Sequence, residues 1–305
     1  MGLAIGVLGL GAWGQTLADL VERQGHQVCS WSRRTGGSPL EVIQGADLVL
    51  VAVALQGVKH LAPELGPHWP QQVPLVSCSK GLDLETQSTA SQLWLGSQPS
   101  LQVVVLSGPN LADELAKGCP AASVLAGRDS VLVQELQQTL SSQQLRLYAS
   151  ADPLGVELAG ALKNVMAIAG GICDGLQLGA NAKASLLCRG MAEMALVLER
   201  LGGDPASLYG LAGLGDLLAT ANSPLSRNYR FGLALAEGKG GDEALVQVGA
   251  TVEGKKTAEA VVAVGERYGL ALPICQQVVD LLEGRCGPRE AVHALMQRSL
   301  RGEQG

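Results

Sequence analysis

Aromatic residues are scarce in this sequence of 305 residues, where four Trp, four Tyr and one Phe make up 3% of the chain. The hydrophobic 47% is mostly Ala, Leu and Val, and 40 glycines allow tight turns and close contacts between helices. This composition disfavours an aromatic-rich β architecture and is typical of a layered α/β or an α protein. We expect two domains, because a single core seldom grows beyond about 250–300 residues.

The chain also has no excess of positive charge, since its net charge is −6. A general attraction for nucleic acid or for an anionic membrane is therefore excluded, and any basic residue that matters must act locally. No apolar run reaches the roughly 18 residues that cross a bilayer, and no basic region precedes the first apolar stretch. We expect a cytoplasmic protein with no membrane insertion and no nucleic-acid partner.

Disulfide and metal signatures are missing as well. The seven cysteines are odd in number and form no C-x-x-C pair, and most lie among apolar residues, where a reduced thiol behaves as a small hydrophobic side chain. The four histidines, at 26, 60, 68 and 293, are scattered without the spacing of metal ligands. We therefore expect a reducing compartment and no metal site.

The most informative stretch that is present is a short apolar strand followed by glycines spaced G-x-G-x-x-G, at Gly9, Gly11 and Gly14. In a dinucleotide-binding fold these glycines allow a tight turn, an unobstructed backbone beside the pyrophosphate and close contact between helix and strand. The segment that follows is predicted to be helical, and the positive end of its dipole attracts phosphate. The motif therefore indicates dinucleotide binding, and a plain glycine-rich turn is the alternative.

Residues 1–150 alternate short apolar runs with helical stretches, which predicts an α/β fold with a doubly wound parallel sheet of the Rossmann type. The candidate strands are 4–8, 27–31, 48–53, 74–78, 101–106, 122–125 and 146–148. Long helical segments rich in Ala, Gly and Leu follow at 153–175, 180–201, 215–222, 226–237, 254–269, 273–284 and 288–300. The sequence thus predicts a dinucleotide-binding domain at 1–150 and an all-α substrate domain at 151–305.

Ligands of an open parallel sheet bind beyond the carboxyl ends of its strands, so the loops at those ends hold candidate site residues. Arg33 and Arg34 follow the second strand, where Asp or Glu usually holds the ribose of NAD. Arginine can instead pair with a 2′-phosphate, which favours NADP over NAD unless both side chains are merely solvated. Lys80 follows the fourth strand and points into the crevice or into solvent. Gly108 follows the fifth strand in a turn whose N–H groups can bind an oxyanion or the substrate, and a simple turn is the alternative.

The apolar segment 154–174 predicts a buried helix, and Lys163 lies within it. Burial of an ammonium is costly, and desolvation lowers the pKa of a lysine towards the range of a general acid or base. Ala167, Gly170 and Asp174 share a helical face with Lys163, and the small residues there would admit a ligand. Lys163 is accordingly a candidate functional residue, and the alternative is a lysine that snorkels to solvent.

A loop and helix start at 213–230 combine Asp216 with the consecutive residues Ser226, Arg227 and Asn228. A hydroxyl, a guanidinium, an amide and a helix N-terminus together suit a phosphate group. Ser226 and Asp216 can each instead be a simple N-cap, which is the alternative explanation of this pattern.

Together these motifs resemble those of the bacterial NAD(P)-dependent glycerol-3-phosphate dehydrogenases. The resemblance covers nearly the whole chain in order and rests on G-L-G-A-W-G at 9–14, S-K-G at 79–81, S-G-P-N-L-A at 107–112, the helix with K-N-V at 158–176, A-G-L-G-D-L at 212–217, S-R-N at 226–228 and V-E-G at 252–254. It implies reversible hydride transfer between NAD(P)H and C2 of dihydroxyacetone phosphate, a small phosphorylated substrate. The product would be sn-glycerol 3-phosphate for phospholipid synthesis.

The resemblance also implies roles for individual residues. Lys163 matches the catalytic lysine, which protonates the substrate oxygen as the hydride arrives, and Asp216 would orient it and balance its charge. The candidate substrate-binding residues are Lys80, Gly108, Asn110, Lys163, Asp216, Ser226, Arg227 and Asn228. The candidate cofactor-binding residues are Gly9, Gly11, Trp13, Gly14, Arg33, Arg34, Lys80, Ala112, Arg227, Thr251 and Glu253.

Three features depart from the family's pattern. Asn110 stands where Ser or Thr is usual, Ala54 replaces a proline after the third strand, and only a short segment joins the second strand to the third. One alternative is a β-hydroxyacid dehydrogenase of the same two-domain plan, which would need a carboxylate site in place of the S-R-N phosphate site. Another is a catalytically silent NADP-sensing protein, against which the presence of Lys163 and Asp216 argues. The sequence allows a homodimer without requiring one.

Overall fold

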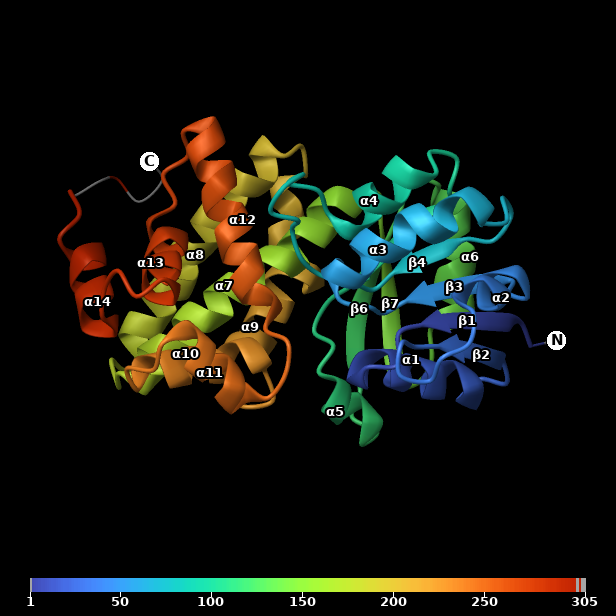
Figure 1. Ribbon diagram of the computed structural model, residues 1–305, viewed down its shortest axis with the longest axis horizontal. Coiled ribbons are helices and arrows are strands. Elements are labelled where there is room, and N and C mark those ends of the chain that lie inside the picture. Colours follow the sequence, from blue (N-terminus) through green and yellow to red (C-terminus); the bar gives the residue numbers. More distant parts are fainter. Residues whose placement is uncertain (1, 300–301, 303–305) are drawn as a thin grey trace.

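The computed structural model describes residues 2–299 and 302, and within them a sheet half is followed along the chain by a helical half (Figure 1). The seven strands lie in the order β2-β1-β3-β4-β5-β6-β7. They are β1 (Ala4–Leu8), β2 (Gln27–Trp31), β3 (Leu48–Val51), β4 (Leu75–Ser77), β5 (Val103–Ser107), β6 (Ala121–Ala126) and β7 (Leu145–Ser150). Each overlaps a predicted strand, with β1 and β2 at the predicted bounds and the ends of the others within two residues of the prediction.

All neighbouring strands run parallel except β5 and β6, which pair antiparallel. A parallel neighbour needs a crossover that carries the chain back over a face of the sheet, usually as a full helix. The connection between β5 and β6 holds only the short helix α5 (Ala112–Ala116), so the chain turns back beside β5. The predicted Rossmann-type α/β fold is confirmed, with this one antiparallel pair as a departure from an all-parallel sheet.

Helices cover both faces of the sheet. They are α1 (Ala12–Arg23), α2 (Pro39–Gln44), α3 (Leu55–Leu65), α4 (Ala90–Ser97), α5 and α6 (Ser130–Leu140). Leu48 and Leu50 of β3 join the hydrophobic cluster formed with α1, α5 and α6, whereas Val49 and Val51 join the cluster with α2, α3 and α4. Successive side chains of a strand point to opposite faces, which is why a strand covered on both faces is apolar throughout.

The helical half contains α7 (Pro153–Gly175), α8 (Ala180–Arg200), α9 (Asp216–Ala221), α10 (Arg227–Ala236), α11 (Gly241–Val248), α12 (Glu253–Tyr268), α13 (Pro273–Leu282) and α14 (Pro288–Met296). The structure gives no strand to the described residues after β7. The last helix ends at Met296, earlier than predicted, and residue 300 of that prediction lies outside the described residues. Helix α11 was not predicted. Its Ala244 and Val248 pack into the core, and this packing stabilises a helix too short to persist alone.

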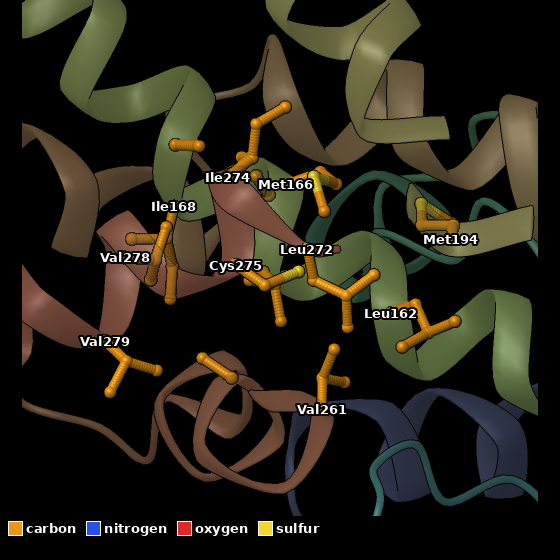
Figure 2. Packing of buried hydrophobic residues seen from close by; sticks show 14 of the residues in the cluster. Leu162, Met166, Ile168, Met194, Val261, Leu272, Ile274, Cys275, Val278 and Val279 are labelled. Carbon is orange, nitrogen blue, oxygen red and sulfur yellow. The ribbon is translucent and has the colours of Figure 1, made fainter. Parts of the chain in front are cut away.

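Helix α7 is the centre of the helical half and is buried from Gly155 to Cys173, as predicted. Figure 2 shows Leu162 and Met166 of α7 beside Val261 of α12 and Leu272 at the start of α13. Among the described residues, α7 is also the one helix long and apolar enough to cross a membrane, although no such segment was predicted. Its apolar window is wholly buried within the fold, and a helix packed on all sides needs apolar residues all round.

The carboxyl ends of β4 and β5 face the first turns of α7. Strand β7 ends at Ser150 and α7 begins at Pro153, with the Asp152 carboxylate accepting a hydrogen bond from Gly155 N. Helix α7 contacts β5, and Leu82, from the loop after β4, is buried in the hydrophobic cluster of the helical half. The two loops that follow β4 and β5 therefore lie against the helix that carries Lys163.

Candidate active site

The glycine motif forms the turn between β1 and α1. Gly9 has a φ of +99°, which favours glycine, and its N–H donates to Trp31 O at 2.8 Å. A side chain at Gly14 would place its Cβ 1.8 Å from Gly9 O, whereas one at Gly11 would point into open space. No side chain caps the N-terminus of α1, and its first turn carries no acid. The N–H groups there can receive a pyrophosphate, so these residues fit a dinucleotide.

Arg33 and Arg34 lie in an exposed turn at the end of β2, beside this motif. The turn is closed by hydrogen bonds between Ser32 and Thr35, including Ser32 N to Thr35 Oγ1 at 3.0 Å. Arg34 Nη2 donates to Leu10 O at 3.3 Å, which draws the second guanidinium towards the glycine motif. Contact of either arginine with the ribose end of a dinucleotide stays a prediction.

Trp13 and Ala112 lie close to the same helix start. Trp13 is half-buried and packs against the hydrophobic cluster under the sheet, so it has a packing role whatever else it contacts. The backbone oxygen of Ala112 accepts a hydrogen bond from Thr16 Oγ1 at 3.5 Å, which joins the start of α5 to α1. Contact of either residue with a cofactor stays a prediction.

Asp216 lies between two lysines from distant parts of the chain. Its Oδ1 is 3.0 Å from Lys163 Nζ, and its Oδ2 accepts a hydrogen bond from Lys80 Nζ at 2.5 Å. The side chains of Asp216 and Lys163 are only 3% and 7% exposed. Thr220 completes the cluster, because its hydroxyl accepts from Lys163 Nζ at 2.6 Å and donates to Asp216 Oδ1 at 3.0 Å. The three charged residues named from the sequence are therefore in direct contact.

Burial and charge set the protonation of this cluster. Burial lowers the pKa of Lys163 to about 8, helped by the nearby charge of Lys80, while Asp216 opposes the change. Burial alone would raise the pKa of the Asp216 carboxyl, but the ammonium groups of Lys163 and Lys80 outweigh it and hold that pKa below its usual value. Near neutral pH the cluster therefore combines an ionised carboxylate with an ammonium that can lose its proton readily.

Lys80 reaches the cluster across the surface of α7. Its Nζ also donates to Gly108 O at 3.0 Å. A side chain at Gly160 would bring its Cβ 3.6 Å from Cδ of Lys80 and 2.3 Å from Oγ of Ser107, so the lysine stem passes where α7 has no side chain. The backbone group of Gly108 that is engaged is the carbonyl. The predicted role for N–H groups of this turn therefore stays a prediction.

The S-R-N run begins α10. The Ser226 hydroxyl accepts from Tyr229 N at 3.2 Å and caps the helix, which is the structural alternative raised from the sequence. Asn228 joins three helices, because its Nδ2 donates to Asn164 Oδ1 at 2.9 Å and its Oδ1 accepts from Gly254 N at 3.0 Å. Arg227 is exposed at the first helical position. Of the three side chains, Arg227 has the greatest freedom to reach a phosphate.

Glu253 lies close enough to both this helix start and the lysine cluster for their charges to act on it. It lies half-buried in the first turn of α12, and burial raises the pKa of its carboxyl although Arg227, Lys80 and Lys163 act in the opposite direction. These interactions place Glu253 among the same cations. Thr251 lies exposed just before α12.

The face of α7 beyond Lys163 differs from the expectation. Ala167 is fully buried, and a Cβ at Gly170 would lie 3.4 Å from the side chain of Ala221 in α9. Asp174 accepts from Lys183 Nζ at 2.5 Å and from the Tyr229 hydroxyl at 2.7 Å. The prediction that this face admits a ligand is wrong, because α9 and α10 pack against it.

Several polar groups around the cluster have no partner among the described residues. The buried side-chain atoms that make no hydrogen bond there include Ser107 Oγ, Asn110 Nδ2 and Asn164 Nδ2. Asn110 Oδ1 accepts from the Ser123 hydroxyl, so its amide group is held in one orientation. Orphaned buried donors are rare in native structures and indicate a missing ligand or water.

Sequence reasoning did not name Thr220, Asn164 or Ser107 as site residues. The spacing of Thr220, four residues after Asp216 and therefore on the same helical face, could have indicated it. Among the described residues no group of three or more His, Cys, Asp and Glu side chains could hold a metal ion, and all seven cysteines are free.

Comparison with known proteins decides the family. A sequence model described as the NAD-dependent glycerol-3-phosphate dehydrogenase C-terminus matches residues 152–293, and its N-terminal counterpart matches 4–43 and 35–133. The chain belongs to this family of dehydrogenases. The resemblance inferred from the motifs is thereby confirmed.

Relatives within this family match over nearly their whole length. The chain is 57% identical to the glycerol-3-phosphate dehydrogenase (NAD(P)+) of Synechococcus sp. strain RCC307, over 99% of this chain and 100% of the relative. It is 47% identical to that of Gloeobacter violaceus over 99% and 100%. The crystal structure of glycerol-3-phosphate dehydrogenase from Coxiella burnetii superposes with a TM-score of 0.93 at 32% identity, covering 97% of this chain and 99% of that one.

Proposed function

We propose that this protein reduces dihydroxyacetone phosphate reversibly to sn-glycerol 3-phosphate with NADPH or NADH, and so supplies phospholipid synthesis. The contacts of buried Asp216 with both Lys163 and Lys80 carry this proposal. Lys80 follows β4 of the same sheet whose first loop, the glycine motif, fits a pyrophosphate. The cluster supplies a proton donor with a pKa near neutral pH on the cofactor side of the fold. Full-length relatives at 57% and 47% identity carry the same activity in their names.

Lys163 provides the proton in the proposed reaction. An ammonium has three N–H donors, and the directions towards Asp216 and Thr220 use two of them. The third donates to the C2 oxygen of the substrate and transfers its proton there as that carbonyl becomes a hydroxyl. When bound, the nicotinamide supplies the hydride to C2. Lys163 is left neutral, and in the reverse direction it takes the hydroxyl proton back.

Asp216 and Lys80 set the charge around that proton. The Asp216 carboxylate stabilises the ammonium form of Lys163, whereas Lys80 favours its neutral form. Because Lys80 also lies beside Gly108, its ammonium can stabilise negative charge that develops on the C2 oxygen. Ser107 and Asn110 each have a buried polar atom with no partner in the described part of the chain, and they provide further hydrogen-bonding groups on this side of the site.

The phosphate of the substrate binds, we propose, at the start of α10. Arg227 provides a positive charge. The N-terminus of α10, which Ser226 caps, adds the partial positive charge of the helix dipole, and both attract phosphate. Asn228 has a different part, since it joins α10 to Asn164, the neighbour of Lys163, and to Gly254. It therefore keeps the phosphate end and the proton-donating end at a constant separation.

NADP is proposed as the better cofactor, because Arg33 and Arg34 occupy the end of β2 and no acid is present in the turn 32–36. Arg34 is drawn towards Leu10, and exposed Arg33 is the side chain that can pair with a 2′-phosphate. Trp13, Ala112, Thr251 and Glu253 are proposed to line the rest of the cofactor site.

We also propose that residues 1–150 form the dinucleotide-binding domain and residues 151–305 the substrate domain, with both domains contributing side chains to the site between cofactor and substrate. Action in the cytoplasm is supported by seven free cysteines, which suit a reducing compartment, and by a net charge of −6, which gives no general attraction for nucleic acid or an anionic membrane. A homodimer stays a prediction, and sedimentation of the purified protein tests it.

The deciding experiment follows NADPH and then NADH oxidation on addition of dihydroxyacetone phosphate. A β-hydroxyacid dehydrogenase would instead oxidise a 3-hydroxycarboxylic acid with NADP+ or NAD+, so the comparison assay follows NADPH or NADH formation when such an acid and the oxidised cofactor are added. We expect activity with the phosphorylated ketone alone. Activity with the hydroxyacid alone favours the alternative enzyme, and tight NADPH binding without turnover of either substrate favours a sensing protein.

A further inference from the structure

Glu157 is a buried carboxylate that the proposed reaction does not use. It lies in α7 with 1% of its surface exposed. Its Oε1 accepts from Ser91 N at 2.9 Å, and its Oε2 accepts from the Ser91 hydroxyl at 2.5 Å. The hydroxyl of Ser77, at 3.5 Å from Oε1, is a longer and weaker contact. Thr89 adds a further side-chain interaction.

These partners lie on either side of residues 78–90, the segment that carries Lys80 and is called the Lys80 segment below. Ser77 is the last residue of β4, three residues before Lys80, and Ser91 lies in the first turn of α4 after that segment. Both are joined through Glu157 to α7, the helix that carries Lys163. One carboxylate thus connects the two ends of the Lys80 segment to the element that bears the proposed proton donor.

Packing alone does not require an acid at this position. Burial raises the pKa of Glu157, and the hydrogen bonds from Ser91, Thr89 and Ser77 oppose but do not cancel that effect. An apolar side chain of similar volume is often at least as stabilising as a buried charge with its partners. A buried carboxylate at this place is better explained by the geometry that its hydrogen bonds impose.

We propose that Glu157 is a positioning residue for Lys80, which keeps the Lys80 ammonium at hydrogen-bond distance from Asp216. This inference rests on the proposed function of the cluster. The stem of Lys80 crosses α7 at Gly160, one helical turn after Glu157, so the carboxylate restrains the segment where the lysine must lie flat on the helix. Leu82 in the core and the ion pair of Lys59 with Asp83, at 3.1 Å, restrain its far side.

The proposal has an electrostatic consequence for Lys163. The charged groups around Lys163 are Lys80 from the loop after β4, Asp216 from α9 and Glu253 from α12. Of these, Lys80 lowers the pKa of Lys163, and the two acids raise it. If Lys80 moves away, its repulsion is lost and Asp216 is shared with one lysine fewer. The pKa of Lys163 then rises above about 8.

The test is Glu157→Gln in the full chain, with Glu193→Gln as the matched control. Glu193 of α8 is another buried acid with a pKa raised by burial, and it accepts from Ile274 N at 2.7 Å and Cys275 N at 3.1 Å at the start of α13. Each substitution replaces a carboxylate that accepts two hydrogen bonds at the start of a helix. Only the first is in contact with the Lys80 segment.

We expect Glu157→Gln to lower kcat for dihydroxyacetone phosphate by about tenfold or more and to move the alkaline limb of its pH profile to higher pH. Glu193→Gln should lower the unfolding temperature by about as much as Glu157→Gln does. Its kcat and its pH profile should be the same as those of the parent protein. Equal kcat and pH profiles in the two variants would overturn the proposal. If Glu157→Gln does not fold, Ser91→Ala replaces it, with a smaller shift expected in the same direction.

Titration of the Lys163 side chain by NMR separates this inference from the proposed function. A parent that does not reduce dihydroxyacetone phosphate contradicts the function. The Lys163 pKa can still be measured in that protein, and the inference requires it to rise in Glu157→Gln and not in Glu193→Gln. An unchanged pKa in Glu157→Gln contradicts the inference even if the parent enzyme is active.

Discussion

Lys163 and Asp216 form an ion pair with a separation of 3.0 Å between Nζ and Oδ1, and both side chains are buried. Neither charge would be tolerable at this place without the other, because an unpaired buried ion is far less stable than an exposed one. The pair nevertheless leaves Lys163 with a pKa of about 8, because burial lowers that pKa and the nearby charge of Lys80 adds to the effect. The arrangement therefore stabilises a lysine that can still release its proton.

Replacement of Lys163 by alanine should abolish turnover and leave cofactor binding intact, because the glycine motif lies on the sheet and not on α7. We expect a loss of kcat of about 10²–10⁴-fold, the range for loss of a general acid. Fluorescence titration with NADPH checks the binding. Lys183→Ala is the control, since that lysine pairs with Asp174 away from the cluster. Robust activity in Lys163→Ala would sink the mechanism.

The rates of the two directions of the reaction should change oppositely as pH passes through the pKa of Lys163, which is about 8. Reduction needs the ammonium form, so its rate is full below that value and falls as pH rises through it. Oxidation needs the neutral amine, so its rate rises over the same interval. Initial rates between pH 6 and 10 test this expectation. A reduction rate that stays constant to pH 10 would exclude Lys163 as the proton donor.

Arg227→Ala should raise the KM for dihydroxyacetone phosphate by about 10–100-fold. This change corresponds to the free energy lost with a hydrogen bond to a charged group. Affinity for adenine-side fragments of the cofactor should change far less. Arg230→Ala serves as the control, because Arg230 is also exposed and lies one turn further along α10. An unchanged KM in Arg227→Ala would mean that the S-R-N run only caps the helix.

Arg33→Ala should raise the Kd for NADPH by about tenfold or more while the Kd for NADH changes little, because the 2′-phosphate is the group it pairs with. Arg34→Ala should have a smaller effect, since its guanidinium is drawn to Leu10 O. Arg128→Ala, in an exposed turn before α6, controls for a general loss of positive charge. Equal changes for both cofactors would show that Arg33 does not discriminate between them.

Short apolar runs that alternate with helical stretches in residues 1–150 predicted the sheet. A strand covered on both faces is apolar throughout, and such a run is visible in the local sequence. The antiparallel pairing of β6 with β5 was beyond that reasoning, since the direction of a strand depends on its connection and not on its own residues. The same limit applies to α11, whose short sequence becomes helical through contacts of Ala244 and Val248 with the core.

In the site, Lys163 could be named from the sequence because a charged residue in an apolar helix is locally unusual. Asp216 could be named because it shares one loop and helix start with Ser226, Arg227 and Asn228. Thr220, by contrast, is an ordinary helical threonine until its hydroxyl is seen between Lys163 Nζ and Asp216 Oδ1. Ser226 shows the opposite case, because a pattern that suited phosphate also suited a cap, and the cap is what its hydroxyl makes.

The sequence by itself determined the glycine turn before α1, the apolar strands and the buried helix around Lys163, because spacing and burial periodicity are properties of neighbouring residues. Only the tertiary structure decided that Lys80, Lys163 and Asp216 meet, and that Glu157 joins the Lys80 segment to α7. Those contacts link residues up to 136 positions apart in the chain. Such contacts follow from how the sheet and the helices pack, and no local pattern carries that information.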